Sequence, residues 1–483
     1  AIVLLPVLAA TCIGEACRAA AALRSWARGV PPAASEPVSL PVRAFSLRYN
    51  LQALVTPAAE ECAGLCCLRV SLTAALLVLH VTQGSKWRNI DELERHHPIF
   101  AAVRPLSLVQ DAFVLLSSYL CAWGHERSRM RVKVDAGSGA GISAGCIQLQ
   151  DGLTRAVRKY ARQLPLCFFW AWVYLDVLPN VSYNMYNHSY PWFGVKWFQN
   201  TGMCMVRRRR YTLLLGDIGA LLYGDPDGHW IQSYGNPCGN LWNFQFEIEA
   251  FTCVACLLAV PRHAGSALTV AVLARGVLAL VQGNDIWLAH HARGVALLLL
   301  FLRALRLPRV GTPAPSRPSG ILPGVLLTAI AAAIHGILEG DWLSEALPGL
   351  SARVCHHKVL STLAYQAALT LGMALACEAF RASAAPPGAK ISVASRLSFG
   401  MNLAHLFVQF YIEAHVSVDI RVFSVFTWLA QLLGIYALSA VTAAAAFLLV
   451  QRPWAVVASA CLDGAGRACG RVARCVNRPG GKK

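Results

Sequence analysis

Long apolar runs recur from one end of this 483-residue chain to the other. A helix needs about 20 apolar residues to cross the hydrocarbon core of a bilayer. Eleven runs approach or reach that length: 1–13, 66–84, 107–124, 163–179, 245–261, 266–283, 286–303, 320–340, 357–379, 396–413 and 423–450. We therefore expect an all-α, polytopic transmembrane bundle of about ten core helices, preceded by one leader helix of which 1–13 is a part.

The composition supports a membrane protein. Hydrophobic residues make up 56% of the chain and charged residues only 14%, whereas about 25% of a soluble domain is charged. A soluble fold with so little charge would expose large apolar patches. The composition therefore excludes a disordered chain or a coiled coil, and the spread of the runs excludes a single-span receptor.

The net charge of +18 is better explained by membrane topology than by nucleic-acid binding. Basic residues gather in the stretches 125–162 and 303–317 and in the tail after Pro453. Positive charge in loops fixes the orientation of a membrane protein, so we expect these stretches on the cytosolic side. We expect no nucleic-acid partner, and a multi-pass protein of an endomembrane or the plasma membrane, with an organellar membrane as the other option.

The order of the runs predicts four parts. A cytosolic-side connecting segment, 14–65, follows the partial leader helix 1–13, and the transmembrane domain occupies 66–454. Within that domain, 125–154 is expected to be a flexible linker and 181–244 a long cap on the far side. A basic tail, 455–483, ends the chain.

The sharpest polar feature is an arginine and a histidine eleven residues apart in the first complete span, Arg69 and His80. Eleven residues make about three helical turns, so both side chains lie on nearly one face, about 16 Å apart along the axis. A histidine inside a bilayer usually faces a polar interior and can act as a general base. The alternative is a structural histidine bonded to a neighbouring helix, with an arginine that reaches the membrane edge.

Further ionisable residues interrupt the other spans. They are Asp111 at the start of the second span, Lys159 and Arg162 at the edge of the third, Arg293 in the sixth and His405 in the ninth. His290 and His291 are adjacent, and adjacent residues of a helix point in different directions. We therefore expect no metal site.

These features together resemble the acyltransferase 3 family, in its branch called nose resistant to fluoxetine. The first-helix pair R-x10-H is matched by Arg69 and His80. The family's "D-x-FF-x-x-SG" helix, "RYxRLxP" boundary and "SYxxYLxH" element are matched by residues 111–118, 159–165 and 398–405. Its "FSxxxN", "WWxN" and "CxxxWYLxxDxQ" motifs resemble 45–50, 197–200 and 238–249.

The sequence departs from the family at a few of these positions. Ser118 stands where the family has glycine, and Gln451 where it has glutamate before the last proline. Glu247 and Glu249 replace the family's acid–amide pair. These departures leave the catalytic activity less firmly implied than the fold.

The resemblance implies transfer of an acyl group, usually acetyl, from acyl-CoA to a hydroxyl of a lipid or sugar. It implies His80, Arg69 and Asp111 as catalytic residues, with His80 as general base or acyl relay. The anionic CoA is expected at Arg69, Lys159, Arg162 and Arg293. The acceptor is expected at Ser117, Glu247, Glu249, Ser398 and His405.

A second hypothesis comes from a different class of protein. The substitutions at Ser118 and Gln451 are compatible with a non-catalytic member that moves lipids or serves as a subunit of a larger membrane complex. Membrane lipids are expected partners in both hypotheses, acyl-CoA only in the first and other membrane subunits in the second.

Overall fold

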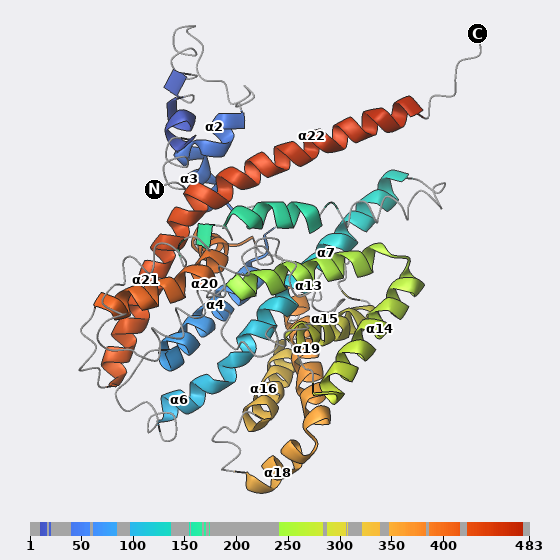
Figure 1. The fold of residues 1–483 in the computed structure, drawn as a ribbon, viewed down its shortest axis with the longest axis vertical. Helices are drawn as coiled ribbons and strands as arrows, with labels where there is room; N and C mark the ends of the chain where they lie inside the picture. Colours follow the sequence, from blue (N-terminus) through green and yellow to red (C-terminus); the bar gives the residue numbers. More distant parts are fainter. Residues whose placement is uncertain are drawn as a thin grey trace. The chain divides into compact units, whose positions relative to one another are not determined.

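Every element that the computed structural model describes is a helix (Figure 1). The described residues are 10–16, 19–20, 40–57, 61–84, 97–136, 154, 156–166, 169–170, 173, 241–283, 287–305, 307, 321–338, 347–382, 386–415 and 423–476. The expected all-α class is confirmed for these residues. The leader 1–13 up to residue 9, most of the span 163–179 and the cap 181–244 up to residue 240 lie outside them.

The chain divides into two compact units. Unit 1 consists of Ala1–Thr56, Val157–Phe169 and Ala444–Lys483, and unit 2 consists of Pro57–Ala156 and Trp170–Ala443. This division cuts across the four parts expected from the sequence, because residues before 57 and after 443 share one unit.

Unit 2 contains the long helices of the bundle. In chain order they are α4 (Ala63–Gly84), α6 (Pro98–Val103), η1 (Arg104–Leu108), α7 (Val109–Ala136), α13 (Leu241–Ala259), α14 (Arg262–Val281), α15 (Trp287–Ala304), α16 (Ile321–Leu338), α18 (Pro348–His356), α19 (Lys358–Ala382), α20 (Ala389–His415) and most of α21 (Val425–Ala446). Nine of these helices correspond to nine of the apolar runs, because a run too apolar for water must satisfy its backbone polar groups internally. The helices α7 and α20 extend well beyond their runs.

The helices of unit 2 pack mainly in pairs: α4 with α20, α7 with α13, α14 with α15, and α16 with α19. The helix α7 also contacts α4, α15 and α19. A core of buried apolar side chains joins these helices, including Leu116, Tyr119, Leu298 and Leu369. Polar residues on these buried faces are therefore held close to partners on other helices.

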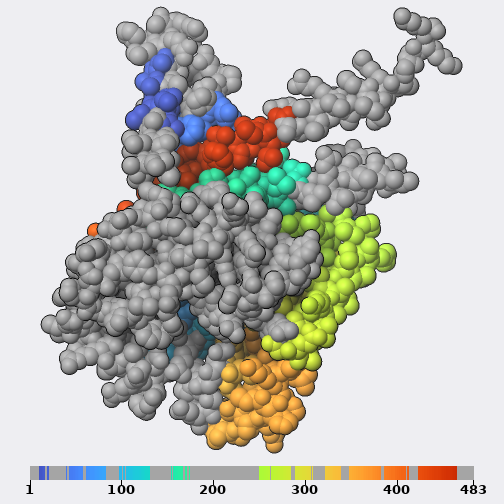
Figure 2. Space-filling view, in the orientation of Figure 1, coloured from blue at the N-terminus to red at the C-terminus, as the bar shows by residue number. Residues whose placement is uncertain are grey.

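Among the residues that the structure describes, six helical stretches are long and apolar enough to cross a membrane, which indicates a multi-pass membrane protein. They are Ala63–Thr82, Pro98–Met130, His263–Val281, Ile321–Leu338, Lys358–Arg381 and Val425–Gly464. Exposed apolar side chains on α14, such as Val270 and Val281, are suited to contact lipid, and Figure 2 shows this helix in yellow-green on the visible surface.

The expected count of about ten spans is not reached by these six. The helices α13, α15 and α20 are not among them. Two of these, α15 and α20, carry buried polar residues, including His291, Arg293, Asn402 and His405, and such residues lower the mean hydropathy of a helix. All three of these helices carry candidate site residues: Glu247 and Glu249 on α13, Arg293 on α15, and Ser398 and His405 on α20.

The prediction of a flexible linker over 125–154 is wrong for residues 125–136. The helix α7 continues to Ala136, whereas 137–153 lie outside the described residues. Glu126 and Arg129 form an ion pair three residues apart on this extension, an arrangement that supports a solvated helix by a few tenths of a kcal/mol. The change to a polar composition therefore marks where the helix leaves the apolar region, and the helix continues beyond it.

Unit 1 contains α2 (Leu40–Phe45), α3 (Leu47–Val55), a helix over 157–166, the π-helical turn η5 (Phe447–Gln451) and α22 (Arg452–Val476). Glu15 accepts hydrogen bonds from the Ser46 hydroxyl and the Leu47 amide at the start of α3. The Asn50 amide donates to Ala44 O and Leu448 O, at 3.1 and 3.0 Å. Ser46 and Asn50, the polar residues of the "FSxxxN" segment, therefore tie together parts of this unit.

Candidate functional site

A histidine pair joins α4 to α20 in unit 2. His80 Nδ1 lies 2.7 Å from His405 Nε2, and the two ring centroids are 4.8 Å apart. His405 is fully buried, whereas His80 is partly exposed. The two histidines singled out in the first and ninth expected spans are therefore direct partners, although 325 residues separate them.

The hydrogen bonds fix which nitrogen of each ring carries the proton. His405 Nδ1 lies 3.2 Å from Met401 O, and a carbonyl oxygen can only accept, so His405 Nδ1 is protonated. In a neutral His405 ring, Nε2 then has the lone pair and accepts the proton of His80 Nδ1. The remaining nitrogen of a neutral His80, Nε2, is consequently the one with a free lone pair.

A stripe of buried polar residues runs along the same face of α20, at intervals of three or four residues. Its members are Ser392, Ser395, Ser398, Asn402, His405 and Gln409. The stripe meets the α4 region at both ends: Ser392 donates to Glu61 at 2.5 Å, and Gln409 donates to His80 O at 3.3 Å. Ser398, an expected acceptor-binding residue, bonds within its own helix to Ala394 O. Because this face is polar in an apolar bundle, it is a strong candidate for a functional site between α20 and α4.

Arg69 lies on α4, eleven residues before His80, and is partly exposed. Its backbone carbonyl accepts the hydroxyl of Thr73. Three helical turns bring Arg69, Thr73 and His80 to nearly the same side of α4. The arginine and the histidine thus mark two ends of one helix face, as the spacing predicts.

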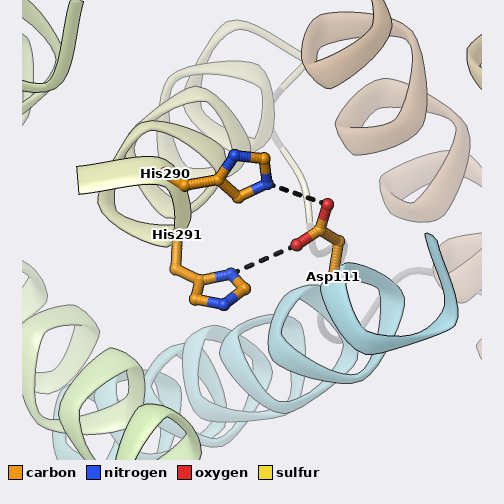
Figure 3. A group of neighbouring side chains, drawn as sticks. All are labelled: Asp111, His290 and His291. Carbon is orange, nitrogen blue, oxygen red and sulfur yellow. Dashed lines mark hydrogen bonds and ion pairs between the residues drawn. The ribbon is translucent and has the colours of Figure 1, made fainter. Parts of the chain in front are cut away.

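A second cluster joins α7 to α15 and consists of Asp111, His290 and His291 (Figure 3). His290 Nε2 lies 3.0 Å from Asp111 Oδ2, and His291 Nδ1 lies 3.2 Å from Asp111 Oδ1. Adjacent residues of a helix point in different directions, yet both rings reach the same carboxylate. His290 uses its outer ring nitrogen and His291 its inner one, so that both rings reach the two oxygens of one carboxylate.

A buried chain of hydrogen bonds continues from His290. The Gln366 amide nitrogen lies 3.0 Å from His290 Nδ1, and Arg293 Nε donates to Gln366 Oε1 at 2.9 Å. Arg293 also donates to Gly276 O at 3.0 Å and is fully buried. Binding of a CoA phosphate by Arg293, as the resemblance implies, would require these internal bonds to be exchanged.

The remaining expected site residues are distributed over both units. Arg162 lies in unit 1, where it donates to Ser459, and Lys159 lies on the same short helix. Ser117 is buried on α7 in unit 2. The backbone of Glu247 and Glu249 belongs to α13, but their side chains lie outside the described part of the structure.

Sequence reasoning missed Gln366 and the partnership of Asp111 with the two histidines. A glutamine inside the apolar helix α19 (Lys358–Ala382) gives only a weak signal, because a single amide does not interrupt a span. A stronger signal was available in α15. There the apolar run 286–303 contains His290, His291 and Arg293 in a stretch of only four residues. Three costly residues in one helical turn require polar partners on neighbouring helices.

In the part of the chain that the structure describes, the helices and their buried polar groups define a helical membrane protein with two polar clusters inside one unit. Comparison of the chain with protein-family models, with curated proteins and with solved structures finds no match.

Proposed function

We propose that this protein is an integral membrane acyltransferase that moves an acyl group from acyl-CoA to a hydroxyl of a lipid or sugar. The observation that carries the proposal is the contact between His80 and His405, 2.7 Å between ring nitrogens. This contact occurs where the sequence resembles the R-x10-H and "SYxxYLxH" motifs of the acyltransferase 3 family. The proposal rests on that resemblance together with the chemistry of the pair.

The pair supports general-base catalysis by orienting one ring nitrogen. Met401 O accepts from His405, and His405 accepts from His80 Nδ1, so the lone pair of His80 is at Nε2. Among the residues that the structure describes, no group forms a hydrogen bond with this Nε2. A base oriented by a second polar group is the usual arrangement for activating a hydroxyl nucleophile.

The proposed reaction is a direct transfer between two substrates. His80 Nε2 takes the proton of the acceptor hydroxyl while the hydroxyl oxygen attacks the thioester carbonyl of acyl-CoA. The tetrahedral intermediate collapses, the bond to sulfur breaks, and the leaving CoA thiolate takes the proton from His80. The products are an ester and free CoA, and the histidine returns to its starting state.

Arg69 is proposed to bind the anionic part of the donor. It lies about 16 Å from His80 along the helix axis, so a donor that contacts both residues has to be extended, as CoA is. Lys159 and Arg162 remain predicted donor-binding residues on the resemblance alone. The resemblance implies a catalytic role for Asp111, but its carboxylate bonds to His290 and His291. The proposed reaction therefore does not use Asp111 to transfer a proton to or from His80.

The test is an acetyl-transfer assay on the full chain purified in detergent and reconstituted with phosphatidylinositol vesicles as the hydroxyl acceptor. Radiolabelled acetyl-CoA is the donor, and labelled ester and free CoA thiol are measured. We expect His80→Gln to lower kcat about 10²- to 10⁴-fold, the range that a general base contributes. Arg69→Gln is expected to raise the KM for acetyl-CoA more than it lowers kcat.

Two further variants distinguish orientation of His80 from general damage. His405→Gln retains an oxygen that can accept from His80 Nδ1 and is expected to keep more activity than His405→Leu. His335→Gln is the matched control, because His335 is a part-buried histidine of α16 bonded to Ser107. Full acetyl transfer by His80→Gln would exclude the mechanism, and no acetyl-CoA consumption by the wild-type protein would favour the non-catalytic hypothesis.

A further inference from the structure

The cluster of Asp111, His290 and His291 has the composition of a transition-metal site. It offers two imidazole nitrogens and one carboxylate, and the three ligand atoms lie within 4.8 Å of one another (Figure 3). Two histidines and a carboxylate on one face are a recurring donor set for divalent first-row metals. We propose that these three residues bind one divalent transition-metal ion, such as Zn²⁺, and thereby cross-link α7 to α15.

The distances in the cluster suit a shared metal ion. Ligands about 2.1 Å from a zinc ion and at its tetrahedral angle lie about 3.4 Å apart. The two nitrogen–oxygen distances are 3.0 and 3.2 Å, so both histidines can bind beside the carboxylate with small movements. The two nitrogens, at most 4.8 Å apart, have to approach each other by up to about 1.4 Å to reach the same separation.

The donor set also selects the type of ion. Magnesium and calcium prefer oxygen ligands, whereas two of the three donors here are imidazole nitrogens, which suit zinc and its neighbours. The cavity beside the cluster has a volume of only about 10 Å³, and its walls include Gln366, Leu369 and Thr370. This space approaches the minimum for a single water molecule, so the ion is proposed to have a structural role.

Gln366 determines how strongly the site can hold a metal. It donates to His290 Nδ1 in the structure, which leaves the ring proton on Nε2, the nitrogen that faces Asp111. A metal ion at Nε2 requires that proton to move to Nδ1, where it needs an acceptor. Gln366 can supply this acceptor only if its carboxamide oxygen turns away from Arg293 Nε, the donor to which it is bonded.

The direct test measures metal content and Zn²⁺ affinity of the full-length protein in detergent micelles. After expression in zinc-supplemented medium, we expect close to one zinc per chain by elemental analysis. The double variant His290→Gln/His291→Gln is expected to retain less than a tenth of that. His356→Gln/His357→Gln, which changes an exposed adjacent pair at the end of α18, is the matched control and is expected to keep the zinc. Addition of Mg²⁺ should not compete.

A second variant is expected to increase the affinity for Zn²⁺, a result that damage to the fold cannot produce. Gln366→Glu supplies a carboxylate that accepts from both Arg293 Nε and His290 Nδ1. Its negative charge also offsets part of the positive charge of the metal ion and of the Arg293 guanidinium. Because outer-shell carboxylates strengthen histidine–metal sites 10- to 100-fold, we expect Zn²⁺ to bind at least tenfold more tightly in titration after chelator treatment. Gln366→Leu should bind it more weakly.

Two outcomes would overturn the metal site. One is Zn²⁺ binding that is the same in the wild type and in His290→Gln/His291→Gln; the other is zinc lost from the His356/His357 control instead. Unchanged affinity in Gln366→Glu would show that His290 Nε2 is not a ligand. None of these measurements depends on acyl transfer, so this proposal and the proposed function succeed or fail separately.

Discussion

At the scale of single residues, Arg293 shows how this bundle accommodates charge. Its guanidinium bonds to Gln366 and Gly276 O with no exposed area, and its apolar stem lies where a side chain at position 276 would be. A Cβ at Gly276 would overlap Arg293 Cγ and would lie 3.2 Å from Ala289 O. The absence of a side chain at Gly276 therefore makes room for a buried cation.

Gly276→Ala is expected to destabilise the protein by about 1–3 kcal/mol, the usual cost of overpacking a tightly filled core. The measurement is the shift in thermal unfolding temperature of the purified protein in detergent. Gly434→Ala is the matched control, since a Cβ at that helical glycine meets nothing within 4 Å. The control should be neutral or slightly stabilising, because alanine favours a helix over glycine by roughly 0.5–1 kcal/mol. Equal shifts in both variants would contradict this account.

At the scale of elements, α16 and α19 pack through small residues. A Cβ on Gly372 would lie 2.9 Å from Gly324 O and 3.1 Å from Thr328 N, and a Cβ on Gly324 would lie 2.9 Å from Gly372 O. Close approach of backbones through glycine is a common way for helices to associate in a membrane. The contact holds α19 in the position from which Gln366 reaches His290 in α15.

Gly372→Ala is expected to separate α16 from α19 and to lower stability by about 1–3 kcal/mol, because backbone atoms cannot move aside as a flexible side chain can. Unfolding in a series of detergent–denaturant mixtures measures the change. Gly349→Ala in α18, where a Cβ meets nothing within 4 Å, serves as the control. If Gly372→Ala unfolds at the wild-type denaturant concentration, the close packing contributes nothing to stability.

At the scale of the whole molecule, the number of membrane crossings depends on helices such as α20. Its composition does not place it among the six most apolar stretches, yet it packs against α4 through a polar face. A helix of 27 residues is about 40 Å long, which is enough to cross a bilayer. We therefore predict that α20 crosses despite its polar residues, because these residues face α4 and avoid lipid.

Labelling with a membrane-impermeant maleimide in sealed vesicles tests this crossing. The three positions are the exposed native Cys355 before α19, Gly388→Cys between α19 and α20, and Ser424→Cys before α21. We expect Cys355 and Ser424→Cys to be labelled from one side and Gly388→Cys from the other, with labelled peptides identified by mass spectrometry. Labelling of Gly388→Cys and Ser424→Cys from the same side would mean that α20 does not cross.

The sequence determined the helical class and most helix positions. A long apolar run can satisfy its backbone only as a helix in lipid, so the runs 66–84 and 357–379 correspond to α4 and α19 with little room for an alternative. The relation between Arg69 and His80 was also available in advance, because it lies within one helix and follows from 3.6 residues per turn.

Only the tertiary structure decided which polar groups meet. His80 bonds to a histidine 325 residues away, and Asp111 to a histidine 179 residues away, and no local rule specifies such pairs. They depend on how α4 and α20, and α7 and α15, are rotated against each other. In an apolar bundle each buried polar group needs a partner, so the sequence shows that partners must exist, whereas the packing of the helices chooses them.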